Sequence, residues 1–353
     1  MKLTTKQAAE IFSSSFLVTG GAGFIGSHIA EFLLTAGARK VRVLDNLATG
    51  HFRNIAPTAN HPRFEFMKGD IRDVDVCKAA CKGMDYVFHL AALGAVSGSI
   101  NDSQTVNNVN TSGFLNMLLV AQEAKVKRFV YASGCPIYGD MNQLPKTGSA
   151  PYAANKYVNE LYADVFARIY GMETIGLRYF NVFGQRHDPQ SEYASVIPKY
   201  VMQLIRYESP VINEADGFSY GFNYVENVVD ANMLAALTTD PEAVNQVYNI
   251  AFEENTSLYQ LAGYLKEYLS AFDERIARIE IVDGVNNNGS HPQHPVVFAE
   301  KAKELLGYQP RYSLQMGLLK STSWYWAYLP QFEEEAAERE HRKLEITNSI
   351  SFS

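Results

Sequence analysis

Short, continuous apolar runs alternate with segments of helical periodicity through the first half of the chain. The runs that predict buried strands are Ser15–Thr19, Val41–Asp45, Phe64–Met67, Tyr86–Leu90, Arg128–Ala132 and Thr174–Tyr179. The segments that predict helices are Ile25–Ala36, Val74–Lys82, Asn108–Ala124 and Tyr152–Tyr170. Strands that are apolar throughout are buried on both faces, so this alternation predicts a doubly wound parallel sheet with right-handed crossovers.

After Gly184 the alternation becomes irregular. Helices are expected at Ser195–Arg206, Val225–Leu237, Ser257–Tyr268, Ala299–Leu306 and Leu314–Tyr328, and short strands at Val211–Asn213, Gln246–Ile250 and Arg278–Val282. We therefore expect an α/β protein with a nucleotide-binding domain over residues 14–184 and a smaller mixed α/β C-terminal substrate lobe over 185–330, partly interleaved with the first. Residues 331–353 are expected to form a charged surface helix, Glu333–Lys343, and a polar tail.

Composition narrows the class of protein. The 353 residues are 47% apolar, which supplies a core, yet no apolar run approaches the roughly 18–20 residues of a membrane span. Met1–Ser15 lacks the apolar stretch of a signal peptide, and the net charge of −7 gives no footprint for nucleic acid. The three cysteines are Cys77, Cys81 and Cys135, a sparse number that favours a reducing cytoplasm. We expect no membrane or nucleic-acid partner and no metal, and we interpret Cys77 and Cys81 as buried structural thiols.

A glycine turn lies between the first strand and the first helix. Gly20 makes the tight turn, Gly23 lets the backbone approach a pyrophosphate and Gly26 permits close packing of helix on strand. The helix N-terminus then offers free N–H groups to phosphates. Asp45 ends the second strand, where an acid binds the ribose hydroxyls of NAD and repels the 2′-phosphate of NADP. These features predict a Rossmann-type NAD site; the alternative is a structural turn. Asp70 is either an adenine-edge contact or the N-cap of the next helix.

Tyr152 and Lys156 open a predicted helix after the fifth strand. Four-residue spacing puts them on one face, one turn apart. A nearby ammonium stabilises the phenolate and lowers the tyrosine pKa. Such a tyrosine acts as a general acid or base beside a nicotinamide.

With these motifs the chain resembles the extended short-chain dehydrogenase/reductases, and more closely the bacterial UDP-N-acetylglucosamine/UDP-N-acetylgalactosamine 4-epimerases. The resemblance covers roughly Phe16 to Tyr328. It is carried by Thr19–Ser27, Leu44–Gly50, Gly69–Asp73, His89–Gly94, Asn110–Leu118, Leu144–Lys146, Tyr152–Tyr170 and Ile175–Gly184. It implies an isomerase of polysaccharide biosynthesis that keeps its NAD bound and acts on a UDP-sugar. It also implies a homodimer joined by a four-helix bundle from the helices at Asn108–Ala124 and Tyr152–Tyr170.

The resemblance assigns roles to individual residues. Tyr152 would take the proton of the sugar 4-hydroxyl while the C4 hydride passes to NAD and later returns to the opposite face. Lys156 would bind the nicotinamide ribose and tune Tyr152. The cofactor-binding set, from the motifs and the resemblance together, is Gly20, Gly23, Phe24, Ile25, Gly26, Asp45, Asn46, Thr49, Gly50, Asp70, Ile71, Leu90, Ala91, Ala92, Asn107, Tyr152, Lys156 and Tyr179. The substrate-binding set is Gly94, Gly134, Cys135, Asn181, Ser195, Val196, Tyr200, Asn213, Tyr220 and Gln293.

The chain departs from the family on the substrate side. Gly134 occupies the position of the family's catalytic hydroxyl, so Ser133, Cys135 or a water must substitute, and Ser133 is our candidate catalytic residue because a thiol is a weak donor. Tyr220 and Gln293 stand where the family has arginines that bind the diphosphate. Uncharged side chains keep hydrogen bonds there but lose the charge-assisted fork.

Three functions remain open. The first is a nucleotide-sugar 4-epimerase with a remodelled site. The second is an NAD-dependent oxidoreductase of the same family acting on a substrate without a diphosphate. The third is a non-catalytic relative that keeps NAD. A sugar dehydratase is less favoured because no Asp-Glu pair lies beside Gly134 to perform the elimination.

Overall fold

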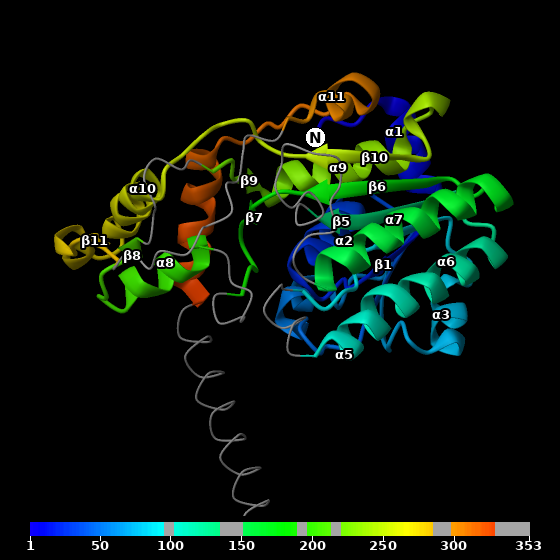
Figure 1. The fold of residues 1–353 in the computed structure, drawn as a ribbon, viewed down its shortest axis with the longest axis horizontal. Coiled ribbons are helices and arrows are strands. Elements are labelled where there is room, and N and C mark those ends of the chain that lie inside the picture. Colours follow the sequence, from blue (N-terminus) through cyan, green and yellow to red (C-terminus); the bar gives the residue numbers. More distant parts are fainter. Residues whose placement is uncertain (95–101, 135–150, 189–195, 213–219, 285–297, 329–353) are drawn as a thin grey trace, which may run out of the picture.

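A seven-stranded parallel sheet forms the centre of the molecule (Figure 1). The computed structural model describes residues 1–94, 102–134, 151–188, 196–212, 220–284 and 298–328. The strands of the sheet are β1 Ser15–Thr19, β2 Lys40–Asp45, β3 Phe64–Lys68, β4 Tyr86–His89, β5 Arg128–Gly134, β6 Thr174–Tyr179 and β10 Gln246–Ile250. They lie in the order β10-β6-β5-β4-β1-β2-β3, and every pairing is parallel. The predicted α/β, Rossmann-type doubly wound class is confirmed.

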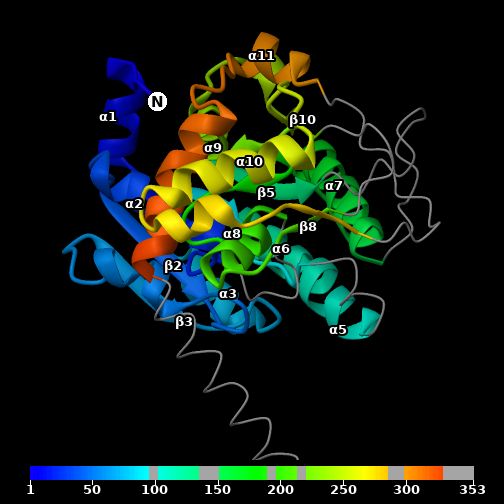
Figure 2. The same cartoon turned by 90° about the vertical axis from the view of Figure 1, so that its left-hand side faces the viewer.

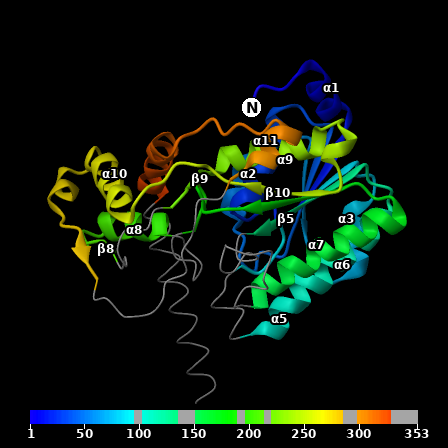
Figure 3. The same cartoon turned by 45° about the horizontal axis from the view of Figure 1, so that its top comes forward.

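Helices cover both faces of this sheet (Figures 1 and 3). One face carries α2 Phe24–Thr35 and α9 Val225–Leu237, and the other carries α3 Val74–Cys81, α6 Phe114–Glu123 and α7 Pro151–Tyr170. Strand β1 supplies both cores, because Phe16 and Val18 join the cluster under α2 and α9 while Leu17 joins the cluster under α3 and α6. Successive side chains of a strand point to opposite faces, so a strand between two helical layers is apolar throughout.

The smaller lobe lies at one end of the sheet (Figures 1 and 2). It contains α8 Val196–Ile205, α10 Leu258–Ser270, the 3-10 helix η6 Glu274–Arg278, the helical residues 314–328 and the strand pair β8 Val211–Ile212 with β11 Val282–Asp283. Phe183, Leu204, Leu265 and Tyr325 belong to its separate buried core. Short strands β7 Val182–Phe183 and β9 Asn223–Tyr224 pair where the chain passes between this lobe and the sheet.

The strand predicted at Gln246–Ile250 forms with those bounds but in the main sheet, whereas the strand predicted at Arg278–Val282 forms only at its last residue. Residues 246–250 are instead the edge strand β10 of the main sheet, paired with β6 from Gln246↔Ile175 to Ile250↔Tyr179. Helix α9 also returns to the main sheet, where it packs on β5 and β6. The predicted strand at 278–282 is mostly the 3-10 helix η6 and its exit, and only the two-residue strand β11 follows. A five-residue apolar run specifies a buried strand but not the sheet that receives it.

The helix predicted over 108–124 is divided in the structure. It begins earlier with α5 Ser103–Asn107, passes through the π-helical turn η3 Asn108–Gly113 and continues as α6. Gly113 packs so closely on Ile71 that a Cβ there would lie 2.7 Å from its side chain. The Asn110 side chain accepts from Leu93 N at 2.8 Å and donates to Leu93 O at 2.9 Å. The widened turn therefore holds the chain that follows β4, and such turns are frequent at functional sites.

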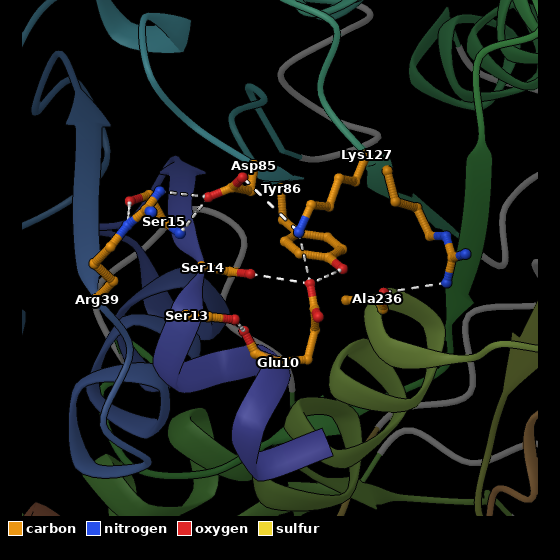
Figure 4. Close-up of polar contacts among 10 residues, drawn as sticks. Glu10, Ser13, Ser14, Ser15, Arg39, Asp85, Tyr86, Lys127 and Ala236 are labelled. Carbon is orange, nitrogen blue, oxygen red and sulfur yellow. Dashed lines mark hydrogen bonds and ion pairs between the residues drawn. The ribbon is translucent and has the colours of Figure 1, made fainter. Parts of the chain in front are cut away.

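An N-terminal helix that we did not predict, α1 Thr5–Ser13, covers the amino edge of the sheet. Its capping box, Thr4 with Gln7, was legible in the sequence as Thr-x-x-Gln. Glu10 Oε1 accepts hydrogen bonds from Ser14 Oγ at 3.0 Å, Tyr86 Oη at 2.8 Å and Lys127 Nζ at 2.8 Å (Figure 4). These residues lie at the starts of β1, β4 and β5, so α1 ties three central strands together at that edge.

The remaining described elements are small. They are α11 Glu300–Leu306 and the 3-10 helices η1 Phe52–Asn54, η2 Ala56–Thr58 and η5 Pro241–Ala243. The helix predicted at 333–343 lies outside the described residues. Within the part of the chain that the structure describes, no helix combines the length and apolar character needed to cross a membrane.

Candidate active site

A cavity of about 450 Å³ runs along the carboxyl ends of β1, β2, β4 and β5. Strand β1 lies between β2 and β4, so the chain reverses its winding there, and ligands of doubly wound sheets bind at such a switch point. The lining combines nearly all of the predicted cofactor residues: Gly20, Gly23, Phe24, Ile25, Gly26, Asp45, Asn46, Thr49, Gly50, Asp70, Ile71, Leu90, Ala91, Ala92, Tyr152, Lys156 and Tyr179.

The glycine turn leaves no room for side chains. Gly20 has φ of +67°, and a Cβ there would lie 2.7 Å from Ala91 N. A Cβ on Gly26 would lie 2.3 Å from Gly20 O. Gly23 is the N-cap of α2 and forms no side-chain cap, so the first N–H groups of the helix remain available at the cavity. The turn is the cradle that a dinucleotide pyrophosphate requires.

Asp45 lies at the end of β2, beside this turn, and lines the cavity. Its Oδ2 accepts from Ala22 N at 2.9 Å and its Oδ1 from Leu47 N at 2.8 Å. Burial raises its carboxyl pKa above the ordinary value, and the two backbone donors oppose that effect. Since a carboxylate has further lone pairs, Asp45 can still receive the ribose hydroxyls of a dinucleotide.

Asp70 lies at the same end of the cavity and is held there by neighbouring side chains. Its carboxylate accepts from Asn46 Nδ2 at 2.8 Å and from Arg72 Nη2 at 2.8 Å, and Arg72 holds the pKa of Asp70 well below its usual range. The N-cap of α3 is Asp73, which accepts from the N–H groups of residues 75 and 76. Asp70 is therefore not the cap of α3, and it lies instead in the lining of the cavity, as the other sequence interpretation requires.

Tyr152 and Lys156 lie on the first turns of α7, which starts with Pro151, a residue suited to the first helical position. Lys156 Nζ donates to Ala132 O of β5 at 2.9 Å and lies 5.7 Å from the centre of the Tyr152 ring. Burial lowers the pKa of Lys156 to about 8, which the charge of Glu160 opposes. Both side chains line the cavity, so a phenol and an ammonium are brought together at its inner end.

Ser133 also lines the cavity, but its hydroxyl is engaged. Ser133 Oγ donates to Glu160 Oε1 at 2.7 Å. Gly134, the last residue of β5, offers no side-chain donor. Tyr179 Oη donates to Asn232 Oδ1 at 3.1 Å, and burial raises its pKa. Tyr152 therefore differs from these neighbours in lying directly beside an ammonium.

The predicted substrate residues are spread more widely. Gly94 lines the cavity. Asn181, with φ of +39°, donates from Nδ2 to Gly221 O at 3.0 Å. Val196 opens α8, Tyr200 is buried in the smaller lobe, and Tyr220 pairs its backbone with Thr256. These four lie outside the cavity lining, on the lobe beyond it. Cys135, Ser195, Asn213 and Gln293 fall outside the described residues.

Asn107 is placed differently from the prediction. It is exposed, absent from the cavity lining, and its Oδ1 accepts from Asn155 Nδ2 at 2.9 Å. Thr105 and Val109, two residues to either side, line the cavity instead. Asn107 is the last residue of α5, immediately before the π-helical turn, and it faces α7.

Sequence reasoning missed a segment, residues 185–188, that crosses the glycine turn. Arg186, His187 and Asp188 all line the cavity. The His187 ring stacks on Phe24, with centroids 4.6 Å apart, and burial lowers its pKa to about 4. Asp188 Oδ2 lies 2.9 Å from His51 Nε2, on the loop after β2. The only sequence signal was a cluster of charged and imidazole groups just after the glycine at 184.

The segment is held from three sides. Arg186 pairs with Glu31 on α2, and His28 Nε2 donates to Gln185 O at 3.0 Å. Tyr325, on the helix 314–328, donates to His187 O at 2.8 Å. The segment beside the glycine turn is thus tied to the loop after β2, to α2 and to the smaller lobe.

The chain has clear relatives. A model described as the NAD dependent epimerase/dehydratase family matches residues 16–251. A UDP-glucose 4-epimerase from Thermotoga maritima, solved with UDP-glucose, is 32% identical with a TM-score of 0.78, covering 89% of this chain and 99% of that one. A UDP-N-acetylglucosamine 4-epimerase from Methanobrevibacter ruminantium, solved with UDP-N-acetylmuramic acid, is 31% identical with a TM-score of 0.79 and the same two coverages.

The similarity extends to enzymes with another outcome. A dTDP-glucose 4,6-dehydratase from Streptomyces venezuelae, solved with NAD bound, is 28% identical with a TM-score of 0.76, covering 88% of this chain and 96% of that one. The similarity therefore points to chemistry on nucleotide sugars and does not by itself select one sugar or one outcome.

Proposed function

Since the chain belongs to the NAD-dependent epimerase/dehydratase family, we propose that it is a nucleotide-sugar 4-epimerase acting on a UDP-N-acetylhexosamine. Family membership confirms the resemblance read from the sequence, the cofactor NAD and an enzyme of the sugar-nucleotide epimerase type. The observation that carries the finer proposal is the Tyr152–Lys156 pair at the inner end of a cavity whose outer end is a dinucleotide cradle.

The cradle fits NAD, because Gly20, Gly23 and Gly26 leave the space that its pyrophosphate needs and Asp45 presents a carboxylate toward the ribose end. When bound, NAD supplies the redox chemistry by accepting a hydride from the sugar C4 and giving it back. Lys156 stays in place through Ala132 O and stabilises the phenolate of Tyr152 by its charge. Tyr152 Oη takes the proton of the 4-hydroxyl and later returns it.

Gly134 changes the expected proton transfer, because it stands where the family has a catalytic hydroxyl beside the tyrosine. Ser133 Oγ donates its hydrogen bond to Glu160 and so can meet other groups only as an acceptor. Because the single hydrogen of the 4-hydroxyl goes to Tyr152, Ser133 would accept a hydrogen bond from a neighbouring sugar hydroxyl or a water and so orient the ring, while Tyr152 alone carries the proton. With Tyr152 as the proton carrier and no hydroxyl at position 134 to assist it, we expect the same reaction at a slower turnover.

For the substrate side we propose that Gly94, Gly134, Asn181, Val196, Tyr200 and Tyr220, with Cys135, Ser195, Asn213 and Gln293, contact the nucleotide sugar. Gly94 and the carboxyl end of β5 border the cavity, and the other described members lie on the lobe that faces it. Support for the N-acetyl sugar comes from the resemblance of the sequence and from the Methanobrevibacter ruminantium relative.

The deciding experiment is a proton NMR time course of the purified, NAD-loaded protein. UDP-N-acetylglucosamine and UDP-N-acetylgalactosamine are supplied separately, with UDP-glucose and UDP-galactose as parallel samples. The proposal expects each N-acetyl sugar to yield its 4-epimer. Conversion of UDP-glucose alone would replace the N-acetyl sugar by UDP-glucose as the proposed substrate. No conversion in folded, NAD-loaded protein would overturn the proposed 4-epimerase activity.

A second candidate is an NAD-dependent oxidoreductase acting on a substrate without a diphosphate. The observation that favours it is Tyr220, whose position carries an arginine in the family. That candidate expects accumulation of NADH with an alcohol substrate, which an epimerase does not produce. If neither activity is found, the third reading, a non-catalytic NAD-binding relative, is the one that stands.

We also propose a homodimer built on α6 and α7. These helices pack side by side on the outer face of the sheet (Figures 1 and 3). Leu119 on α6 and Leu161 on α7 are 42% and 49% exposed, a large apolar exposure for side chains in mid-helix. Light scattering after size exclusion tests the state, and a monomer at micromolar concentration would overturn it.

We propose a cytoplasmic location from the state of the thiols. Cys77 and Cys81 are both free and buried, and burial raises the pKa of each to about 12. Unpaired thiols suit a reducing compartment.

A further inference from the structure

The face of α7 that carries Tyr152 and Lys156 bears a third ionisable side chain, Glu160. The three residues recur every four positions, so they lie along one side of the helix toward β5 and β6. Glu160 is 7% exposed. A carboxylate buried this deeply needs partners, since an unpaired charge inside a protein is very costly.

Glu160 has partners on two strands. Its Oε1 accepts from Ser133 Oγ at 2.7 Å and from Arg178 Nε at 2.8 Å, and its Oε2 accepts from Arg178 Nη2 at 2.6 Å. Ser133 on β5 and Arg178 on β6 are direct neighbours in the sheet register. One carboxylate therefore fastens α7 to both strands at the level of the catalytic pair.

The same carboxylate acts on Lys156 through charge. Lys156 Nζ bonds to Ala132 O, the residue before Ser133. Burial lowers the pKa of Lys156 to about 8, and Glu160 raises it. Without the anion, the ammonium would keep only the Ala132 carbonyl and the Tyr152 ring as partners among the described residues.

The other titratable groups around this cluster have defined states. From β4, His89 is held neutral because burial lowers its pKa to about 3. From β5, burial holds the pKa of Tyr131 well above its usual range. From β6, Arg178 is the cation that pairs with Glu160, and from α11, Lys301 has its pKa lowered by burial and by Arg178. Asp164, one turn further along α7, pairs with Arg168 on the surface.

We propose that Glu160 is a positioning residue for the NAD-dependent reaction, which holds α7 on β5 and β6 and sets the pH range in which Tyr152 and Lys156 work. This role rests on the proposed function, because it acts through the catalytic pair. Glu160 itself is not among the residues that line the cavity.

The direction of the effect follows from charge. The working state needs Tyr152 as a phenolate and Lys156 as an ammonium. A nearby anion disfavours the phenolate and favours the ammonium, so it raises the pKa of both groups. Removing the anion lowers both, and the range of activity moves to lower pH. Removing the cation of Arg178 does the reverse.

The first test is the pH profile of kcat/KM for wild type, Glu160→Gln and Arg178→Gln. Glu160→Gln is expected to shift both limbs about one pH unit toward acid, and Arg178→Gln to shift both toward alkali. Glu160→Asp keeps the charge and is expected to leave the limbs near the wild-type positions. A loss that is equal at every pH, with unmoved limbs, would assign Glu160 a purely structural role and overturn the proposal.

A matched control removes a similar pair far from the site. Arg128 at the start of β5 pairs with Glu173, with Nη2 to Oε2 at 2.6 Å. Glu173→Gln is expected to leave both the rate and the limbs unchanged. If Glu160→Gln does not fold, Arg178→Gln decides the matter by its opposite sign, and unmoved limbs in that variant would overturn the proposal.

The second test does not use activity. Protein labelled with ¹³Cε-lysine is titrated by NMR, and Lys156 is assigned by the signal lost in Lys156→Arg. The pKa of Lys156 is expected to fall by about one unit in Glu160→Gln. An inactive wild type with this shift would overturn the epimerase proposal while leaving the electrostatic role intact. An unmoved Lys156 would overturn the role of Glu160 alone.

Discussion

The two ends of the cavity are held in place by different means. At the cofactor end the backbone is decisive, because side chains at Gly20 and Gly26 would collide with main-chain atoms. At the catalytic end the geometry depends on side chains, with Lys156 on a carbonyl and Ser133 on Glu160. A site made of backbone tolerates few substitutions, whereas a site made of side chains can be rebuilt one residue at a time. The glycine at 134 is such a change.

The largest effect is expected at Tyr152. Tyr152→Phe removes the proton carrier but keeps the ring, so turnover is expected to fall about 10²- to 10⁴-fold. NAD content after gel filtration is expected to stay near that of wild type, because the glycine turn, Asp45 and Lys156 are unaltered. Turnover within threefold of wild type would mean that another group carries the proton.

The next prediction concerns Asp45 at the cofactor end of the cavity and the preference for NAD over NADP. Wild type is expected to bind NAD at least about 100-fold more tightly than NADP, since a 2′-phosphate would meet the carboxylate. Isothermal titration of cofactor-free protein measures both affinities, and Asp45→Ala should narrow the ratio. Equal affinities in wild type would remove the role that we give to Asp45.

Gly134→Ser restores a hydroxyl at the catalytic end. We expect turnover to rise about tenfold, within the range that acid–base assistance provides. The NMR assay measures it, and Gly134→Ala is the control for added bulk without a donor. Equal or lower turnover in the serine variant would show that no proton carrier is missing.

The smallest effect concerns the segment over the glycine turn. Asp188→Asn weakens its contact with His51, and we expect NAD to dissociate about tenfold faster, a change equivalent to ~1.4 kcal/mol. Exchange of bound NAD for a labelled excess gives the rate. Asp164→Asn breaks a surface pair of similar length and is the control. An unchanged rate would show that the segment does not retain the cofactor.

Local patterns were sufficient to predict most of the sheet and the residues that line the glycine-turn end of the cavity. Strands β1 to β6 are apolar runs, and the glycine turn and Asp45 lie within one strand–helix–strand unit, so short-range rules cover them. The absence of a hydroxyl at 134 was likewise visible from the residue type. These features depend on neighbours in sequence, which a single sequence displays.

Other features depend on partners far along the chain. His51 and Asp188 are 137 positions apart, and His28 and Gln185 are 157 apart. Strand β10 became part of the main sheet through a pairing with β6, which no local pattern encodes. The sequence did not distinguish Glu160 from other polar residues of its helix, because its partners lie on β5 and β6. Helix α1 is different, because its capping box was legible and was overlooked.

The attachment of α1 at the amino ends of the central strands restricts how the sheet can open. Glu10 fastens β4 and β5 to the helix that leads into β1, so these strands cannot splay apart at that end. The cavity lies at the opposite, carboxyl ends of the strands, which this attachment leaves free. Amide hydrogen exchange should accordingly be slow at the amino ends of β1, β4 and β5, and substitution of Glu10 should speed it there.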